Sequence, residues 1–159
     1  MEAKSELKRE FSAGGVVFKK RPRGKPLWLL IQPKAQKQPW RADRWQLPKG
    51  LIGKTESSAA AALRETREEG GVGVEIIDKV DAIQIFFYNE NKEKVAKKIT
   101  FYLMEASQEA ETGLDKAEVA KITWQPYQKA YQQLTFDSEK KVLKKAKEML
   151  DKGIQERLT

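Results

Sequence analysis

The sequence contains no cysteine and no histidine among its 159 residues. The absence of cysteine excludes disulfide bonds, thiolate nucleophiles and cysteine-ligated zinc or iron–sulfur sites within this chain. The absence of histidine excludes Ser-His-Asp triads, imidazole-ligated metals and histidine as a general base. Any catalytic chemistry of these residues therefore has to use carboxylates, lysine, tyrosine, hydroxyl groups or a metal ion held by oxygen ligands.

Long apolar runs are also missing. No stretch approaches the ~20 apolar residues that a membrane-spanning helix needs, and residues 1–7 are polar, without the apolar centre of a signal peptide. We therefore expect a cytoplasmic protein without a membrane partner. The length and the hydrophobic fraction of 40% suit one globular core, so we expect a single domain over residues 1–159.

Negative charge is in short supply relative to positive charge. Lys and Arg total 31 against 23 Asp and Glu, which gives a formal net charge of +8. Such a surface attracts phosphates, nucleic acid and anionic lipid. Lysine-rich helices that only keep the protein soluble would produce the same excess, so charge alone does not choose between these functions.

Apolar segments separated by turn residues predict a mixed α/β domain. The predicted strands cover residues 11–18, 27–32, 81–88, 99–104 and 119–124. The third and fourth of these strands flank a short charged stretch, so we expect them to pair in antiparallel fashion.

Three helical patterns accompany these strands. The first covers residues 57–69, with Thr55 or Ser57 as its N-cap and two glycines after its end. Its predicted apolar side consists of Ala59, Ala60, Leu63 and Thr66. A short helical pattern begins at Pro126, and a longer amphipathic helix is predicted over about 137–152.

The segment 50–72 concentrates the side chains that can support chemistry. Glu68 and Glu69 follow Glu65 by three and four positions, so the three carboxylates leave a helix on one side. Two carboxylates ~4 Å apart repel by roughly 4 kcal/mol at an effective dielectric of 20, and the negative end of the helix adds to this penalty. Mg²⁺ or Mn²⁺ suits such oxygen-only ligands, with Arg64 orienting them. For these residues alone, an exposed helix with Glu–Arg pairs is the alternative.

The same segment matches the pattern G-x5-E-x7-R-E-U-x-E-E-x-G-U, in which U is apolar, and therefore resembles the Nudix family. Its seven fixed places are filled by Gly50, Glu56, Arg64, Glu65, Glu68, Glu69 and Gly71. Val72 satisfies the last apolar place, whereas Thr66 is a departure at the first one. The strand AGGVVF, the approach WQLPKG and the later antiparallel pair extend the resemblance over residues 11–124.

The resemblance implies an α/β/α sandwich in which a mixed β-sheet lies between helices. It also implies a Mg²⁺-dependent enzyme in which water attacks a phosphoanhydride of a nucleoside polyphosphate, with one of the metal-binding glutamates as the base. The implied metal ligands are Glu65, Glu68, Glu69, the backbone carbonyl of Lys49 and, from a late loop, Glu118. Orienting roles are implied for Gly50, Glu56, Arg64 and Gly71.

Two further fragments bear on the substrate. WQLPKG and the late run QQLTFDSEKKVLKKA resemble dinucleoside polyphosphate hydrolases, so we expect a diadenosine polyphosphate that contacts Lys49, Lys54 and Tyr88. Trp40 and Tyr102 are further candidates for stacking on a base. Three alternatives stay open: hydrolysis of oxidised purine nucleoside triphosphates, as in MutT-like members; a non-catalytic nucleotide- or RNA-binding module; and a lysine-rich module whose apolar stripe 142–150 binds a partner protein.

Overall fold

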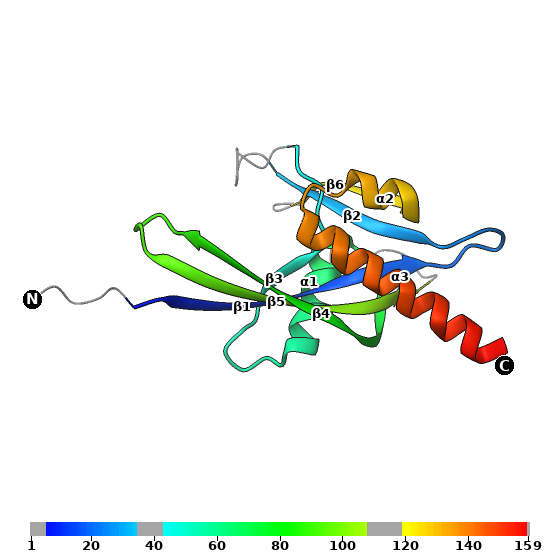
Figure 1. Cartoon of the computed structure of the whole chain (residues 1–159), viewed down its shortest axis with the longest axis horizontal. Coiled ribbons are helices and arrows are strands. Elements are labelled where there is room, and N and C mark those ends of the chain that lie inside the picture. Colours follow the sequence, from blue (N-terminus) through cyan, green and yellow to red (C-terminus); the bar gives the residue numbers. More distant parts are fainter. Residues whose placement is uncertain (1–5, 35–42, 108–118, 159) are drawn as a thin grey trace, which may run out of the picture.

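The computed structural model describes residues 6–34, 43–107 and 119–158, so Trp40 and Glu118 lie outside the described residues. Strands and helices are interspersed along the chain (Figure 1). Their bounds are β1 Lys8–Lys19, β2 Leu27–Pro33, β3 Lys49–Leu51, α1 Ser58–Gly70, β4 Val74–Tyr88, β5 Lys94–Ala106, β6 Val119–Pro126, α2 Tyr127–Gln133 and α3 Asp137–Leu158.

One mixed sheet organises these elements. Its strand order is β4-β5-β1-β2-β6, and the short strand β3 also pairs with β1. Strand β1 runs parallel to β5 from Lys8 to Phe18 and antiparallel to β2 and β3. The middle of β1 therefore pairs with β3 and its last residues pair with β2, which places β3 against the middle of the sheet.

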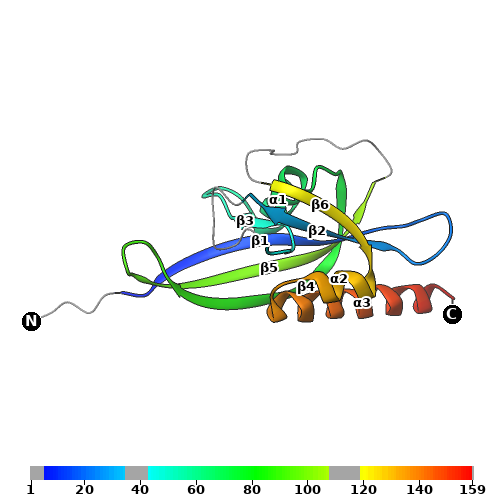
Figure 2. The ribbon, with the colours of Figure 1, turned by 90° about the horizontal axis from the view of Figure 1, so that it is seen from above.

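Helices cover both faces of this sheet. Helix α1 lies on one face, and α2 and α3 lie on the other (Figure 2). Each face has its own buried cluster: Val16, Phe18, Phe101 and Leu143 belong to the cluster under α2 and α3. Ala13, Val17, Ala61, Ala62 and Met104 belong to the cluster under α1. The expected α/β/α sandwich is therefore confirmed.

The predicted elements are present, with three differences in the sheet. All five predicted strands and all three helical patterns occur, and β4 and β5 form the expected antiparallel pair but are longer than predicted. Strand β3 was not predicted, because its three residues, KGL, carry no alternation that marks a strand. The parallel pairing of β1 with β5 was not predicted either, since it joins segments far apart in the chain.

The predicted apolar side of α1 is partly wrong. Ala61 and Ala62 are fully buried against the sheet together with Thr66, whereas Ala60 is exposed. The run of alanines makes the direction of the apolar face ambiguous, because any of four consecutive small residues can pack closely on a sheet. No helix in the described part of the chain is long and apolar enough to cross a membrane.

Candidate active site

Helix α1 is fixed at both ends by its own sequence. The side chain of Ser57 accepts a hydrogen bond from the N–H of Ala60 at 3.1 Å, which confirms Ser57 as the N-cap. Gly71 ends the helix in the left-handed conformation with a φ of 64°, and its N–H donates to the carbonyl of Arg67 at 2.9 Å. The last two turns, which carry Glu65, Glu68 and Glu69 (the acidic cluster), therefore have a defined end.

Two glycines of the sheet allow α1 to approach closely. A Cβ atom on Gly50 would overlap the carboxyl group of Glu65, so this carboxylate lies directly against the α-carbon of Gly50. A Cβ atom on Gly15 would lie 2.6 Å from the hydroxyl of Thr66, which is fully buried. The polar departure at Thr66 is thus accommodated by a glycine on β1, although its hydroxyl has no hydrogen-bond partner among the described residues.

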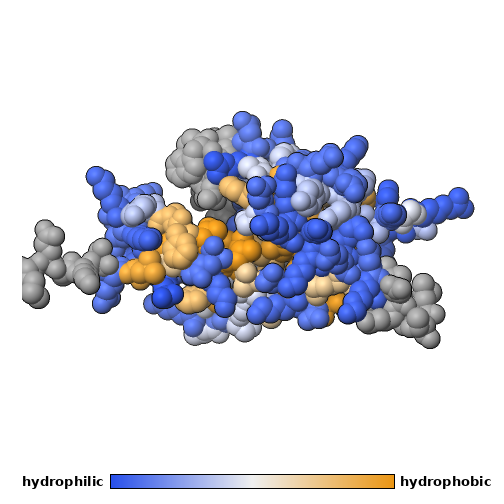
Figure 3. All heavy atoms as spheres, viewed as in Figure 1, coloured by the Kyte–Doolittle hydropathy of each residue, from blue (hydrophilic) through white to orange (hydrophobic). Residues whose placement is uncertain are grey.

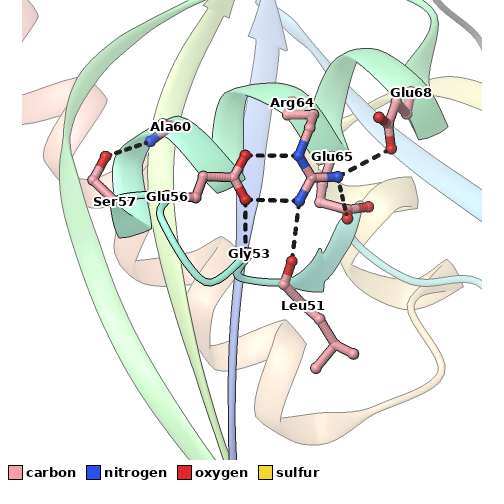
Figure 4. Close-up of polar contacts among 8 residues, drawn as sticks. All are labelled: Leu51, Gly53, Glu56, Ser57, Ala60, Arg64, Glu65 and Glu68. Carbon is pink, nitrogen blue, oxygen red and sulfur yellow. Dashed lines mark hydrogen bonds and ion pairs between the residues drawn. The ribbon is translucent and has the colours of Figure 1, made fainter.

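Arg64 connects the acidic cluster to the loop before α1 (Figure 4). Its Nε and Nη2 donate to the two carboxylate oxygens of Glu56 at 2.7 and 2.9 Å, and Nη2 also donates to the carbonyl of Leu51 at 3.1 Å. Its Nη1 donates to Glu65 at 2.8 Å and to Glu68 at 3.3 Å. One guanidinium therefore holds three carboxylates and a strand carbonyl in a fixed arrangement.

These bonds shift the pKa values of both partners. The hydrogen bond from Arg64, followed by one from the N–H of Gly53, lowers the pKa of Glu56 from 4.5 to about 2. The bond to Glu56 in turn raises the pKa of Arg64. Both groups stay charged across the neutral range, so the positive charge beside Glu65 and Glu68 is permanent.

Lys49 places its backbone next to the third member of the cluster. Its N–H donates to Oε2 of Glu69 at 2.9 Å, and Glu69 is 9% exposed. Because Pro48 accepts a hydrogen bond from the N–H of Gly15, the alternation of an antiparallel ladder turns the N–H and C=O of Lys49 away from β1. The carbonyl of Lys49 therefore points to the same edge as Glu69, as the predicted role of this carbonyl requires.

The side chain of Lys49 has a different direction. Its ammonium forms an ion pair at 2.9 Å with Glu139, which comes from α3 and is 3% exposed. The predicted phosphate contact of this ammonium stays a prediction. Glu139 was missed in the sequence, because its partners precede it by about 90 positions and only the folded chain joins them.

The predicted site residues fall into two groups. Glu56, Arg64 and the acidic cluster are brought together with the backbone of Lys49, as described above. Lys54 is exposed on the loop before α1, and Tyr88 is 71% exposed at the end of β4, so neither has a contact that tests its predicted role. Glu118 lies outside the described residues.

The acidic cluster offers the donor set that a hard cation prefers. Its members are carboxylates within one helical turn of each other, the Lys49 carbonyl faces the same edge, and the chain has no histidine or cysteine. Within the described residues, no three acidic side chains are already arranged as an ion-binding group, because Glu65 and Glu68 are turned toward Arg64. The oxygen donors therefore suit a divalent ion. To bind it, the side chains of Glu65 and Glu68 have to rotate away from Arg64.

A cavity of about 120 Å³ lies beside the Lys49–Glu139 ion pair. Its lining combines apolar residues of β4, β5 and the start of α3 with charged groups: Lys49, Ile83, Ile85, Lys97, Ile99, Phe136, Ser138 and Glu139. Figure 3 shows an apolar patch on the same face, beside the first turns of α3 and over the β4–β5 hairpin. A flat apolar group can be placed here close to the backbone that faces the acidic cluster.

Comparison with known proteins decides the family. A family model described as the NUDIX domain matches residues 8–146. The chain belongs to the Nudix family. The matched Nudix region includes the whole acidic cluster and the first part of α3, up to residue 146.

Relatives agree with this membership. The protein named MutT4 of Mycobacterium tuberculosis is 30% identical over 150 residues, which cover 90% of this chain. The chain spans only 56% of the length of that curated relative.

Solved Nudix structures share the fold at lower identity. An Ap4A hydrolase of C. elegans, in a binary complex, gives a TM-score of 0.71 at 23% identity, covering 89% of this chain and 98% of that one. The NUDIX domain of Shewanella oneidensis NrtR, complexed with ADP ribose, gives 0.67 at 21% identity, covering 94% of each chain. The E. coli dihydroneopterin triphosphate pyrophosphohydrolase gives 0.63 at 16% identity, covering 86% of this chain and 94% of that one. At these identities the likeness establishes the fold.

Proposed function

We propose that this Nudix chain is a Mg²⁺-dependent pyrophosphohydrolase of nucleoside polyphosphates, and that its preferred substrate is a diadenosine polyphosphate. The observation that carries the proposal is that Glu69 accepts the N–H of Lys49 while Arg64 holds Glu65 and Glu68, which lie within one turn of Glu69 on the same helix. The structural likeness to an Ap4A hydrolase supports the choice of substrate.

The acidic cluster and the Lys49 carbonyl would hold the metal ion, with Mn²⁺ able to substitute for Mg²⁺. When bound, such an ion supplies positive charge to the scissile phosphates and lowers the pKa of a water molecule. A further carboxylate from Glu118 is proposed for the same set. Gly50 keeps the space that the carboxylate of Glu65 needs to turn toward the ion.

The residues of the chain itself then have distinct tasks. Arg64 neutralises part of the charge of the acidic cluster. Its two hydrogen bonds to Glu56 hold the guanidinium in place beside Glu65 and Glu68. Glu68 is the carboxylate best placed to take a proton from the attacking water. Its side chain is 40% exposed, and its bond to Arg64 is, at 3.3 Å, the longest of the five that this guanidinium makes.

The cavity beside the Lys49–Glu139 pair is proposed to receive one nucleobase. Ile83, Ile85 and Ile99 supply apolar contacts for a ring, and Lys97 supplies charge next to them. Lys54 and Tyr88, both exposed, are proposed to contact the rest of the substrate. Because a single small cavity holds one base, a purine nucleoside triphosphate with an oxidised base is the second candidate substrate.

The proposal is tested by product analysis on a substrate panel. The protein is incubated with Mg²⁺ and diadenosine tetraphosphate, 8-oxo-dGTP, ATP or ADP-ribose, and the products are separated by anion-exchange chromatography. We expect the highest kcat/KM for diadenosine tetraphosphate. A preference for 8-oxo-dGTP would establish the second candidate, and no turnover of any compound despite bound metal would contradict a hydrolase and favour a binding module.

The variant Glu68→Gln tests the site assignment in the same assay. It should lower kcat by several orders of magnitude while the melting temperature without metal stays level or rises, because one carboxylate of the repelling cluster becomes neutral. Glu148→Gln, an exposed glutamate of α3, is the matched control and should retain full activity. Equal activity in both variants would contradict the assignment.

A further inference from the structure

A buried carboxylate outside the Nudix helix is engaged with the active-site strand. Glu139, in the first turn of α3, lies on the face of the sheet opposite to α1. Its Oε1 accepts the N–H of Leu47 at 2.6 Å, and its Oε2 accepts a hydrogen bond from the ammonium of Lys49 at 2.9 Å. A carboxylate that is 3% exposed has lost most of its hydration, so these two bonds are what stabilise its charge.

The backbone around Pro48 is held from both faces of the sheet. Pro48 itself has no N–H. The N–H groups on either side of it, those of Leu47 and Lys49, are each taken by a buried carboxylate: Glu139 from α3 and Glu69 from α1. Lys49, whose carbonyl faces the edge of the acidic cluster, is therefore held through its backbone by Glu69 of one helix and through its side chain by Glu139 of another.

From this arrangement we infer that Glu139 is a positioning residue for the metal site, acting through Leu47 and Lys49. Its two bonds set the direction of the Lys49 backbone, which presents an N–H to Glu69 and a carbonyl to the edge where the metal ligands meet. Helix α3 thereby acts on the metal site through Lys49, although it carries none of the proposed ligands. The metal part of the inference rests on the proposed function, whereas the control of the Lys49 backbone does not.

The charge of Glu139 matters as much as its shape. The side chain of Lys49 is 11% exposed, and its ammonium is paired with Glu139. Removing the carboxylate charge leaves an ammonium with little access to water, which is unfavourable unless the side chain moves toward solvent. The flexible lysine stem can move without the backbone, so the backbone responds because the charge-assisted bond from Glu139 to the N–H of Leu47 becomes a weaker neutral one.

Amide hydrogen exchange tests the backbone part without substrate or metal. In Glu139→Gln, the neutral side chain keeps an acceptor for Leu47 but loses the ion pair, and we expect the Lys49 amide to exchange at least about 10-fold faster than in the wild type. Glu148→Gln, the same substitution on an exposed site of α3, should leave this amide unchanged. An unchanged Lys49 amide in Glu139→Gln would overturn the inference.

Metal binding and kinetics test the consequence for the site. Residues that orient metal ligands typically change metal affinity or activity by about 10–100-fold, so Glu139→Gln should weaken Mn²⁺ binding and lower kcat by such a factor, with KM little changed. Glu139→Asp keeps the charge and should recover part of the loss. If Glu139→Gln only lowers the melting temperature and binds Mn²⁺ as tightly as Glu148→Gln does, Glu139 has a structural role alone and the inference is overturned.

These two measurements also separate this inference from the proposed function. If the wild type turns over no nucleotide, the proposed function fails, and the exchange rate of the Lys49 amide still decides whether Glu139 positions this backbone. Should Glu139→Gln not fold, the same comparisons are made with Glu139→Asp, whose shorter side chain lengthens the bonds to Leu47 and Lys49.

Discussion

Arg64 shows how one side chain can organise a cluster of like charges. Its guanidinium binds Glu56 through two parallel hydrogen bonds, which is the strongest geometry for an arginine–carboxylate pair. The remaining donors reach Glu65 and Glu68. The repulsion between the carboxylates is thus partly compensated before any metal binds, and the helix can form with its acids in place.

The first prediction at this scale concerns Gly50. Replacing it with alanine puts a methyl group into the carboxylate of Glu65, so that either the helix or the side chain has to move. A displacement of ~1 Å at a catalytic group can cost about 100-fold in rate, so Gly50→Ala should lower kcat/KM by at least this factor. The matched control is Gly153→Ala in α3, where a Cβ meets no atom within 4 Å and activity should be unchanged. Steady-state kinetics of both variants with the best substrate of the panel make the comparison.

The second prediction follows from the pKa of Glu56. Because this pKa is lowered to about 2 in the folded protein and is 4.5 when unperturbed, the unfolded chain takes up the proton first as the pH falls. The stabilisation by ionised Glu56 is therefore complete above about pH 4.5 and is lost as the pH falls toward 2. The melting temperature of Glu56→Gln should lie below that of the wild type at pH 6, and the difference should shrink steadily between pH 4.5 and pH 2. A constant difference over this range would show that Glu56 acts through its shape alone.

At the scale of elements, the end of α1 carries the third prediction. Gly71 has a φ of 64°, which an alanine adopts at a cost of about 1–2 kcal/mol and an asparagine tolerates better. Gly71→Ala should therefore lower the free energy of unfolding by this amount, measured by urea denaturation, and loosen the turn that carries Glu68 and Glu69. Gly71→Asn should stay close to the wild type. If both variants are equally stable, the left-handed turn does not determine where α1 ends.

Local sequence was sufficient to predict most elements and the acidic face of α1. The strands 11–18 and 27–32 are apolar runs bounded by turns, and the spacing of Glu65, Glu68 and Glu69 dictates a shared side of any helix. These features depend on neighbours within a few residues. Such short-range patterns can be recognised in the sequence without knowledge of the folded structure.

Long-range contacts could not be predicted in the same way. The bonds of Glu139 to Leu47 and Lys49, and the carbonyl of Leu51 that Arg64 binds, join segments through the tertiary structure. Strand β3 is a strand because β1 pairs with it, not because of its own composition. The direction of the Lys49 side chain, toward α3, likewise follows from the register of this pairing.

At the scale of the whole molecule, the net charge of +8 leads to the fourth prediction. A basic surface raises the local concentration of a polyanionic substrate, and salt screens this attraction, with a Debye length of about 10 Å at 0.1 M ionic strength. Raising NaCl from 50 to 300 mM should therefore increase KM for diadenosine tetraphosphate several-fold while kcat changes little, as measured by initial rates. A KM that does not depend on salt would mean that only the short-range contacts of the site attract the substrate.

The pairing of β1 with β5 has a consequence for the order in which the protein assembles. Lys8 pairs with Val95 and Phe18 with Glu105, so β1 leaves the ribosome long before the strand that flanks it has been translated. Until then β1 lacks β5 as a neighbour. Strand β3, which is translated before β5, already depends on its pairing with β1. Pairings between distant segments slow folding, so the completed sheet forms late, and the packing of α1 against β5 can form only once the second half of the polypeptide has emerged.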